Sequence, residues 1–502
     1  MGGTETPTAG PSLAGRFAAA IALTIGFYLL ALALAAGLLA VAILPWVLSG
    51  HGNLWVSLTG LVLGVTILVA IVPRRRRFEA PGALVTAEDQ PRLIELIAGE
   101  SRALDMEPPD EVYATFEVNA AVTEAGRSRR VMIVGLPLLQ FISERGLRGI
   151  VAHELGHYAG GDTRLGPWIY RTRETIGRTL DHLTDEDGDE GWTQLAVRKP
   201  FEWYATAFLH ITAKISRQQE YAADRFAVRR AGRDVYAESL RRLHAFGPAF
   251  DPYWGQEVVP ALTAERRPPV AAGFATFIGT EAVQRAGAEW VEEELRERKT
   301  ERYDSHPALA DRLRALEDLP PGEADDSPPA ADLLRDLPAL EQRVFGVLYG
   351  DEAAASLAPI AWEDVGQSVY LERARELTSR FHYVLDGVSA VGLGEAVGRS
   401  SQLAGDVQRR EPDIGYDDAI ALVPAVLRDG LLLALEGAGW ELTANLAEPL
   451  LCRHAGHEVV PSLVVAELYD KTLDAGAWAA RTRELGLADL SLERPAVATA
   501  GG

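Results

Sequence analysis

The sequence is poor in cysteine and carries no excess of basic residues. Its 502 residues include one cysteine, Cys452, so no disulfide can form within the chain. Lys and Arg number 49 against 71 Asp and Glu, which gives a formal net charge of −22. Because binding to a phosphate backbone needs a basic surface, this balance argues against a nucleic-acid partner. The few methionines among many Ala, Arg and Gly are typical of a GC-rich bacterial genome.

Charged residues are absent from one long stretch, residues 17–73. A membrane helix needs about 20 apolar residues, so this stretch is long enough for two passes. A Gly-rich polar segment interrupts it and predicts membrane helices over about 17–44 and 54–72. Four arginines at 74–77 follow at once, and the positive-inside rule places them in the cytoplasm. We therefore expect a multi-pass hairpin in a bacterial cytoplasmic membrane, with tail 1–16 and all later residues inside the cell.

The remainder of the chain has patterns that indicate two folded units. Residues 78–317 alternate between helical and strand-like periodicity, with strands expected over 111–123 and 130–134, which predicts an α+β, mainly helical domain. Residues 318–332 (DLPPGEADDSPPAAD) are acidic and rich in proline, a composition typical of a linker between domains. Residues 333–495 then form a separate, smaller α/β domain whose role the sequence does not indicate.

Two segments of the first domain allow more than one interpretation. The acidic stretch 181–191 (DHLTDEDGDEG) is expected to be a solvated connection, with an active-site lid as the alternative. Residues 201–215 are apolar and aromatic but carry polar residues, which favours a core helix over a helix lying on the membrane surface.

The motif that carries chemistry is HELGH at 153–157. On a helix, His153 and His157 project from the same face, so both imidazoles can reach one metal ion. Glu154 lies between them and can contact a water activated by the metal without binding the metal itself. This arrangement predicts a Zn²⁺ site with His153 and His157 as ligands and Glu154 as the general base. The alternative is an amphipathic helix with two incidental histidines.

A catalytic zinc ion usually has three protein ligands and one open position. No histidine follows at short spacing, and the next along the chain are His182, His210 and His244. A more distant carboxylate is therefore expected. In SRQQEYAAD at 216–224, Glu220 and Asp224 lie four residues apart on one face of a helix. Glu220 could bind the metal and Asp224 could orient a ligand histidine, although by spacing alone Glu220 could equally be a surface carboxylate.

Together, HELGH at 153–157 and SRQQEYAAD at 216–224 resemble the HtpX and CAAX prenyl protease family of membrane zinc metallopeptidases. The resemblance covers roughly residues 80–317 and implies a gluzincin-type peptidase fold. It implies that Glu220 is the third zinc ligand, and that Asp224 and Asp162 support the ligands without binding the metal themselves. The family usually has further membrane spans after the zinc helix, and this chain shows none that is convincing.

Two further segments resemble the same family. VNAAVTEAG at 118–126 resembles the strand before the family's zinc helix, which implies that Asn119, Ala120 and Ala121 contact an extended substrate by β-addition. DSHPALADRL at 304–313 resembles its His-Pro motif, which implies that His306 donates a hydrogen bond to the oxyanion of the tetrahedral intermediate. From its residues alone, this second segment could simply be the start of a helix.

These observations favour a membrane-anchored zinc endopeptidase that hydrolyses membrane or misfolded proteins at the cytoplasmic face. One alternative is a catalytically silent scaffold, which an intact Glu154 disfavours. The other is a prenyl-protein processing protease, which would need a larger membrane chamber than one hairpin. The expected partners are a peptide or protein substrate and the lipid bilayer, and the C-terminal domain is a candidate surface for homo-oligomers or a partner protein.

Overall fold

The computed structural model of the chain describes residues 13–72, 78–125, 129–159, 192–300 and 307–493. The chain divides into two compact units. The first comprises Met1–Gly247 and Gly287–Leu340, and the second comprises Pro248–Ala286 and Glu341–Gly502. The acidic stretch 181–191 lies outside the described residues. Both units are mainly helical, and the described residues form one sheet in the first unit and two small sheets in the second.

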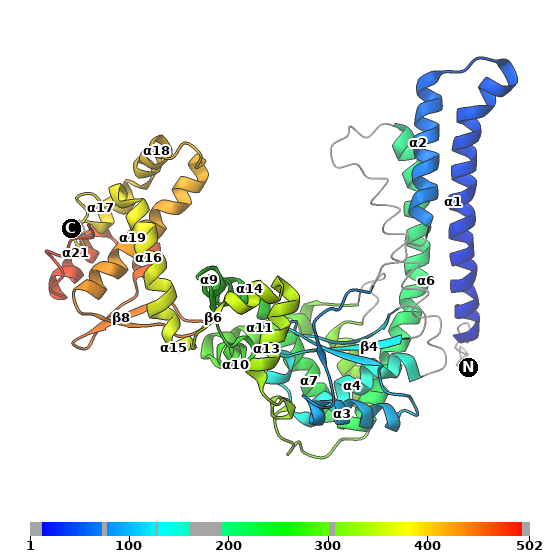
Figure 1. The fold of residues 1–502 in the computed structure, drawn as a ribbon, viewed down its shortest axis with the longest axis horizontal. Helices are drawn as coiled ribbons and strands as arrows, with labels where there is room; N and C mark the ends of the chain where they lie inside the picture. Colours follow the sequence, from blue (N-terminus) through cyan, green and yellow to red (C-terminus); the bar gives the residue numbers. More distant parts are fainter. Residues whose placement is uncertain (1–12, 73–77, 126–128, 160–191, 301–306, 494–502) are drawn as a thin grey trace, which may run out of the picture. The chain divides into compact units, whose positions relative to one another are not determined.

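Two apolar helices begin the first unit, α1 (Leu13–Ser49) and α2 (Leu54–Ile71), and they pack against each other (Figure 1). The side chain of Asn53 caps α2 by accepting hydrogen bonds from the backbone N–H groups of Trp55 and Val56. Gly60 lets the two backbones approach closely, since a Cβ atom there would lie 2.9 Å from the carbonyl oxygen of Leu38.

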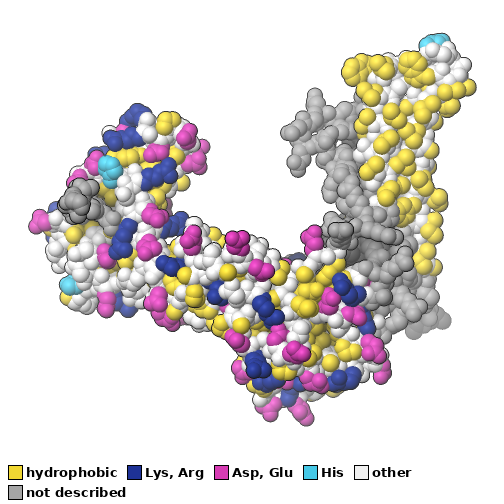
Figure 2. Space-filling model, viewed as in Figure 1, with side chains coloured by type: hydrophobic (Ala, Val, Ile, Leu, Met, Phe, Trp, Pro, Cys, Tyr) yellow, Lys and Arg dark blue, Asp and Glu magenta, His cyan; other side chains and the backbone are white. Residues whose placement is uncertain are grey.

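The outer face of this helix pair is covered with exposed hydrophobic side chains (Figure 2). By length and composition, one described helix, at Ile21–Ser49, could cross a membrane, and Leu54–Val69 is a shorter apolar helix. The first predicted membrane helix, 17–44, extends further in the structure because α1 continues through Pro45 to Ser49.

The four-stranded sheet of the first unit has the order β1-β2-β4-β3. Its strands are β1 (Ala83–Val85), β2 (Glu111–Thr115), β3 (Ala120–Ala125) and β4 (Arg129–Gly135). Strands β2 and β4 are parallel, whereas β3 pairs antiparallel with β4 and forms an edge of the sheet. The sequence suggested one strand over 111–123, but the structure divides this segment into β2 and β3.

Helices surround the sheet of the first unit. These are α3 (Pro91–Ala103), η1 (Leu138–Gln140), α4 (Glu144–Ala159), α6 (Trp192–Ala231), α7 (Arg233–Phe246), α12 (Leu309–Glu317) and η4 (Ala330–Leu333). The expected core helix at 201–215 is part of α6, a single 40-residue helix that also contains Glu220. Within the first half of α6, Ala205 and Phe208 are buried against Phe27 of α1, so one helix joins the apolar pair to the segment that contains Glu220.

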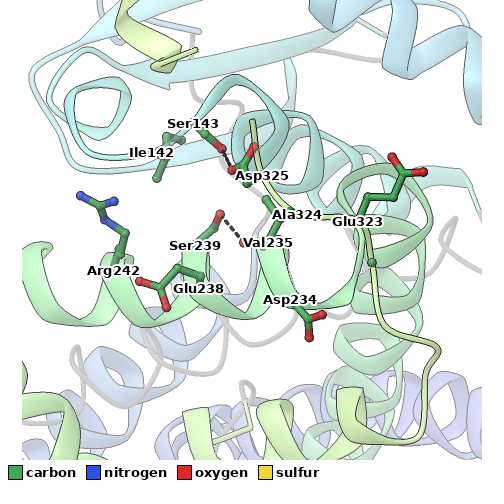
Figure 3. Close-up of a pocket in the computed structure, with 11 residues that line it drawn as sticks. Ile142, Ser143, Asp234, Val235, Glu238, Ser239, Arg242, Glu323, Ala324 and Asp325 are labelled. Atoms are coloured by element: carbon green, nitrogen blue, oxygen red, sulfur yellow. Dashed lines mark hydrogen bonds between the residues drawn. The ribbon is translucent and has the colours of Figure 1, made fainter. Parts of the chain in front are cut away.

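Residues 318–332, here called the strap, pack onto the start of α4 instead of forming a free linker (Figure 3). The hydroxyl of Ser143 donates a hydrogen bond of 2.5 Å to Asp325. The backbone N–H of Glu144 donates to the carbonyl of Pro328, and that of Arg145 donates to the hydroxyl of Ser327. The strap is therefore ordered because its carbonyl and hydroxyl groups satisfy the first amides of a helix.

Two helices, α11 (Glu281–Glu297) and α13 (Leu337–Tyr349), contain boundaries between the units. The other α-helices described in the second unit are α8 (Phe250–Tyr253), α9 (Val259–Thr263), α10 (Val270–Gly279), α14 (Asp351–Ser356), α15 (Trp362–Val365), α16 (Leu371–Arg380), α17 (Leu393–Gly398), α18 (Ser400–Arg410), α19 (Tyr416–Gly437), α20 (Pro461–Tyr469) and α21 (Ala475–Glu484). Two short π-helices, η3 (Trp254–Val258) and η5 (Gly366–Tyr370), and one 3-10 helix, η6 (His382–Val384), accompany them.

The strands of the second unit form two small sheets, one of β5 (Arg266–Arg267) and β6 (Ala358–Pro359) and one of β7 (Glu441–Thr443), β8 (Leu451–His454) and β9 (His457–Val459). Its largest core surrounds α19 and includes the fully buried Trp478. The segment Pro248–Ala286, expected within the peptidase domain, groups with this unit. The reason is local packing, since the indole N–H of Trp362 donates to the carbonyl of Pro269, just before α10.

Candidate metal centre

The helix that carries the HELGH motif packs closely on α6. Leu147, Val151 and Leu155 of α4 are completely buried, which fixes the rotation of the helix. At Gly149 a Cβ atom would lie 2.8 Å from the Cβ atom of Ala231 on α6, so only glycine allows this approach. The two helices therefore lie side by side, and α4 turns its histidines toward α6.

Three side chains from these helices converge. His153, His157 and Glu220 each offer one ligand atom, and the three atoms lie within 4.8 Å of one another. The Nε2 atom of His153 lies 3.5 Å from Oε2 of Glu220, and the Nε2 atom of His157 lies 3.7 Å from Oε1. The structure thus brings together the three residues that the sequence proposed as zinc ligands. Among the described residues, these three are the His, Cys, Asp or Glu side chains that lie close enough together to hold one metal ion.

Asp224, one helical turn after Glu220, contacts His153 through the ring nitrogen that does not face Glu220, as expected for a residue that orients a ligand. Its Oδ1 atom is 3.0 Å from Nδ1 of His153. Tyr236 of α7 donates a hydrogen bond of 2.8 Å to the same carboxylate, and Arg312 of α12 contacts both Asp224 oxygens. Because a carboxylate at Nδ1 favours the proton there, the lone pair of Nε2 is left to face Glu220 and His157.

The electrostatics of this cluster favour a bound cation. Burial raises the pKa of Asp224, but hydrogen bonding to His153 and the charge of Arg312 outweigh that effect and lower the pKa to about 2. Burial lowers the pKa of His153, yet hydrogen bonds to Asp224 and Glu220 raise it to about 9. A field that favours a proton on this ring also favours a divalent cation at the same place. The donor set of two imidazoles and one carboxylate fits zinc in a catalytic site.

Glu154 and the edge strand complete the described part of the site. Glu154 follows His153 on α4 and is partly exposed, whereas His153 and Glu220 are buried. Strand β3 lies against α4, and Asn119 immediately precedes it. The carbonyl of Asn119 accepts a hydrogen bond from the backbone N–H of Gly135, so its main chain already belongs to the sheet.

Two residues proposed from the sequence, Asp162 and His306, lie outside the described residues. Two others, Tyr236 and Arg312, were missed, and both hold Asp224. Arg312 could have been suspected, because it lies in the DSHPALADRL segment and a buried Asp224 would need a cationic partner.

Comparison with known proteins agrees with this geometry. Residues 87–319 match Peptidase family M48. Protease HtpX of Psychrobacter sp. strain PRwf-1 is 25% identical over 257 residues, which cover 47% of this chain and 75% of that protein. A Protease HtpX homolog of Archaeoglobus fulgidus is 22% identical over 318 residues, or 62% of this chain and 91% of that protein. The chain is therefore HtpX-like, with a domain over residues 87–319 that matches Peptidase family M48.

Proposed function

We propose that the chain is a membrane-anchored zinc endopeptidase. The observation that carries the proposal is the convergence of His153, His157 and Glu220 within 4.8 Å, on two helices locked together by packing. Two imidazoles and one carboxylate leave a fourth position of a tetrahedral zinc ion open for water or substrate. The fold alone would not distinguish a peptidase from an inactive relative, so the argument rests on these side chains.

The residues around the site have different roles in the proposed hydrolysis. Zinc, when bound, polarises the scissile carbonyl and lowers the pKa of a water molecule. Glu154 accepts the proton from that water and later delivers it to the leaving amine. Asp224, Tyr236 and Arg312 hold His153 in the tautomer and orientation that ligation requires.

The substrate we propose is an extended segment of a membrane or misfolded protein. Strand β3 is an edge of its sheet, and an edge strand can pair with another extended chain. Folded proteins do not offer such a segment, so the substrate must be locally unfolded. The exposed apolar faces of α1 and α2 suit a lipid bilayer, and Arg74–Arg77 favour a catalytic unit on the cytoplasmic side.

The test of this proposal is casein cleavage by zinc-loaded protein in detergent, with zinc quantified in wild type and in Glu154→Gln. Glutamine keeps the size of the side chain but cannot accept the proton. We expect equal zinc content, cleavage by wild type, and a loss of activity by at least about a hundredfold in the variant. Retained zinc without cleavage by either protein would favour the scaffold alternative.

A further inference from the structure

The outer edge of β3 offers few backbone groups to a substrate, because its residues alternate in direction. The carbonyl of Asn119 accepts a hydrogen bond from Gly135 in the antiparallel pair with β4. In such a pair every second residue bonds to the partner strand, and the residues between direct their N–H and C=O groups the other way. Ala120 and Val122 are therefore the first two residues whose backbone groups point away from β4.

One of these outward groups is already engaged. The hydroxyl of Tyr158 donates a hydrogen bond of 2.9 Å to the carbonyl oxygen of Val122. Tyr158 follows His157 on α4, so its half-buried ring connects the helix of the metal centre to the edge strand. This bond joins the two walls between which an extended peptide would lie.

We propose that Tyr158 ends the peptide-binding edge at Val122, so that Ala120 is the main backbone anchor for the substrate. The inference rests on the proposed peptidase function and defines how many substrate residues form backbone hydrogen bonds with β3. An antiparallel peptide exchanges two hydrogen bonds with one residue, so Ala120 alone can hold it. A parallel peptide would bond the same two groups of Ala120 through two different residues, so the antiparallel arrangement needs the shortest piece of substrate.

The direction of β3 determines which part of the substrate lacks backbone hydrogen bonds to it. An antiparallel peptide runs opposite to β3, so the residue facing Val122 lies two positions N-terminal to the residue facing Ala120. Tyr158 therefore limits recognition on the N-terminal side of the substrate residue that faces Ala120. Beyond that residue, the substrate gains no further backbone hydrogen bonds from β3.

The experiment measures binding of N-acetylated oligoalanine hydroxamates, one to four residues long, to zinc-loaded protein by calorimetry. The hydroxamate group binds the metal, and each added residue extends the peptide in the N-terminal direction along β3. In wild type we expect affinity to stop rising before the longest peptide. In Tyr158→Phe the carbonyl of Val122 is released, so the longest peptide should bind about fivefold more tightly than to wild type, while the shortest is unchanged.

Two further variants separate the possible outcomes. Tyr158→Leu also removes the ring and should give at least the same gain. Tyr113→Phe is the matched control, because the hydroxyl of Tyr113 bonds to Glu111 on β2, and it should behave as wild type.

A steady rise of hydroxamate affinity with length in wild type, equal to that in Tyr158→Phe, would overturn the role of Tyr158. Casein cleavage by wild type is measured separately. If casein is cleaved and hydroxamate affinity rises equally with length in wild type and Tyr158→Phe, only this inference fails. If no hydroxamate binds and casein is not cleaved, both proposals fail; if no hydroxamate binds but casein is cleaved, the Ala120 anchor fails alone.

Discussion

Asp224 is the residue on which the metal centre depends most, although it is not itself proposed as a ligand. It is 1% exposed, and a carboxylate so deeply buried is stable only with strong partners. Arg312 supplies the opposite charge, while Tyr236 and His153 supply hydrogen bonds. Arg312 therefore balances the charge of Asp224, and the cluster fixes His153 before any metal arrives.

Replacing Tyr236 tests this arrangement with the smallest change. Tyr236→Phe removes one hydroxyl that donates to Asp224 and lies 3.0 Å from Nδ1 of His153. We expect zinc affinity to fall about tenfold, the effect typical of groups that orient metal ligands. The measurement is competition with a chelator of known affinity. Tyr253→Phe, which removes an equally buried hydroxyl in the second unit, is the control and should leave zinc affinity unchanged.

Glu341 is a second buried carboxylate, and its pKa predicts a pH dependence of stability. It accepts hydrogen bonds from the backbone N–H groups of Val270 and Ala271 at the start of α10. Burial raises its pKa to about 7, although these hydrogen bonds oppose the shift. Between pH 4.5 and 7 the folded chain therefore holds more protons at this site than the unfolded chain, so this contribution to stability falls as pH rises.

The expected loss is roughly 3 kcal/mol across that window, with no further change above it. Glu341→Gln cannot titrate, so the difference in unfolding free energy between wild type and the variant should shrink or change sign as pH increases. Hydrogen exchange at the amides of α10, followed from pH 4.5 to 8, reports this difference. A difference that stays constant with pH would show that Glu341 titrates normally.

Helical spacing together with the family resemblance was needed to propose the donor set from the sequence. The four-residue interval of His153 and His157, and that of Glu220 and Asp224, each place two side chains on one face, and the structure brings the faces together. Tyr236, Arg312 and Tyr158 could not be found in the same way. Their roles depend on contacts between distant helices and strands, for which no local pattern exists.

At the scale of elements, one buried carboxylate connects three helices of the peptidase domain. Glu100 of α3 is completely buried and forms ion pairs with Arg148 of α4 and Arg230 of α6. Since α4 and α6 carry the proposed ligands, this cluster fixes their separation from the side of α3. Each arginine is partly exposed, so water can compensate in part if the carboxylate is lost.

We expect Glu100→Gln to destabilise the domain by about 2 kcal/mol, because two guanidinium groups lose their buried partner. The matched control is Glu95→Gln on the same helix, where an exposed pair with Arg102 is broken. That change should cost less than about 0.5 kcal/mol. Chemical denaturation of both variants gives the comparison, and equal stabilities would mean that the buried cluster contributes little.

Element boundaries were predicted less well than element types. The strand expected over 111–123 is divided because β2 and β3 both pair with β4 but in opposite directions. Composition made 318–332 resemble a linker, whereas its serine and carbonyl groups bind the start of α4. Nor does a sequence pattern reveal that Pro248–Ala286 belongs to the second unit, since this grouping arises from tertiary packing.

At the scale of the whole molecule, the four arginines at 74–77 predict the membrane topology. With one native cysteine, which is buried, labelling of new cysteines is straightforward. In a Cys452→Ser background, His51→Cys tests the turn between α1 and α2, and Glu79→Cys tests the start of the peptidase domain. A membrane-impermeant maleimide should label only the first in intact cells, since the arginines favour the cytoplasmic side. Labelling of the second instead would reverse the proposed topology.

The most direct test of the metallopeptidase is removal and return of the metal. Casein cleavage by wild type should disappear after chelation and return with one equivalent of zinc per chain. Glu220→Ala should not recover under the same conditions, because it lacks one of the three proposed ligands. Cleavage that persists in protein shown to contain no zinc would contradict the account, as would full recovery of Glu220→Ala at one equivalent.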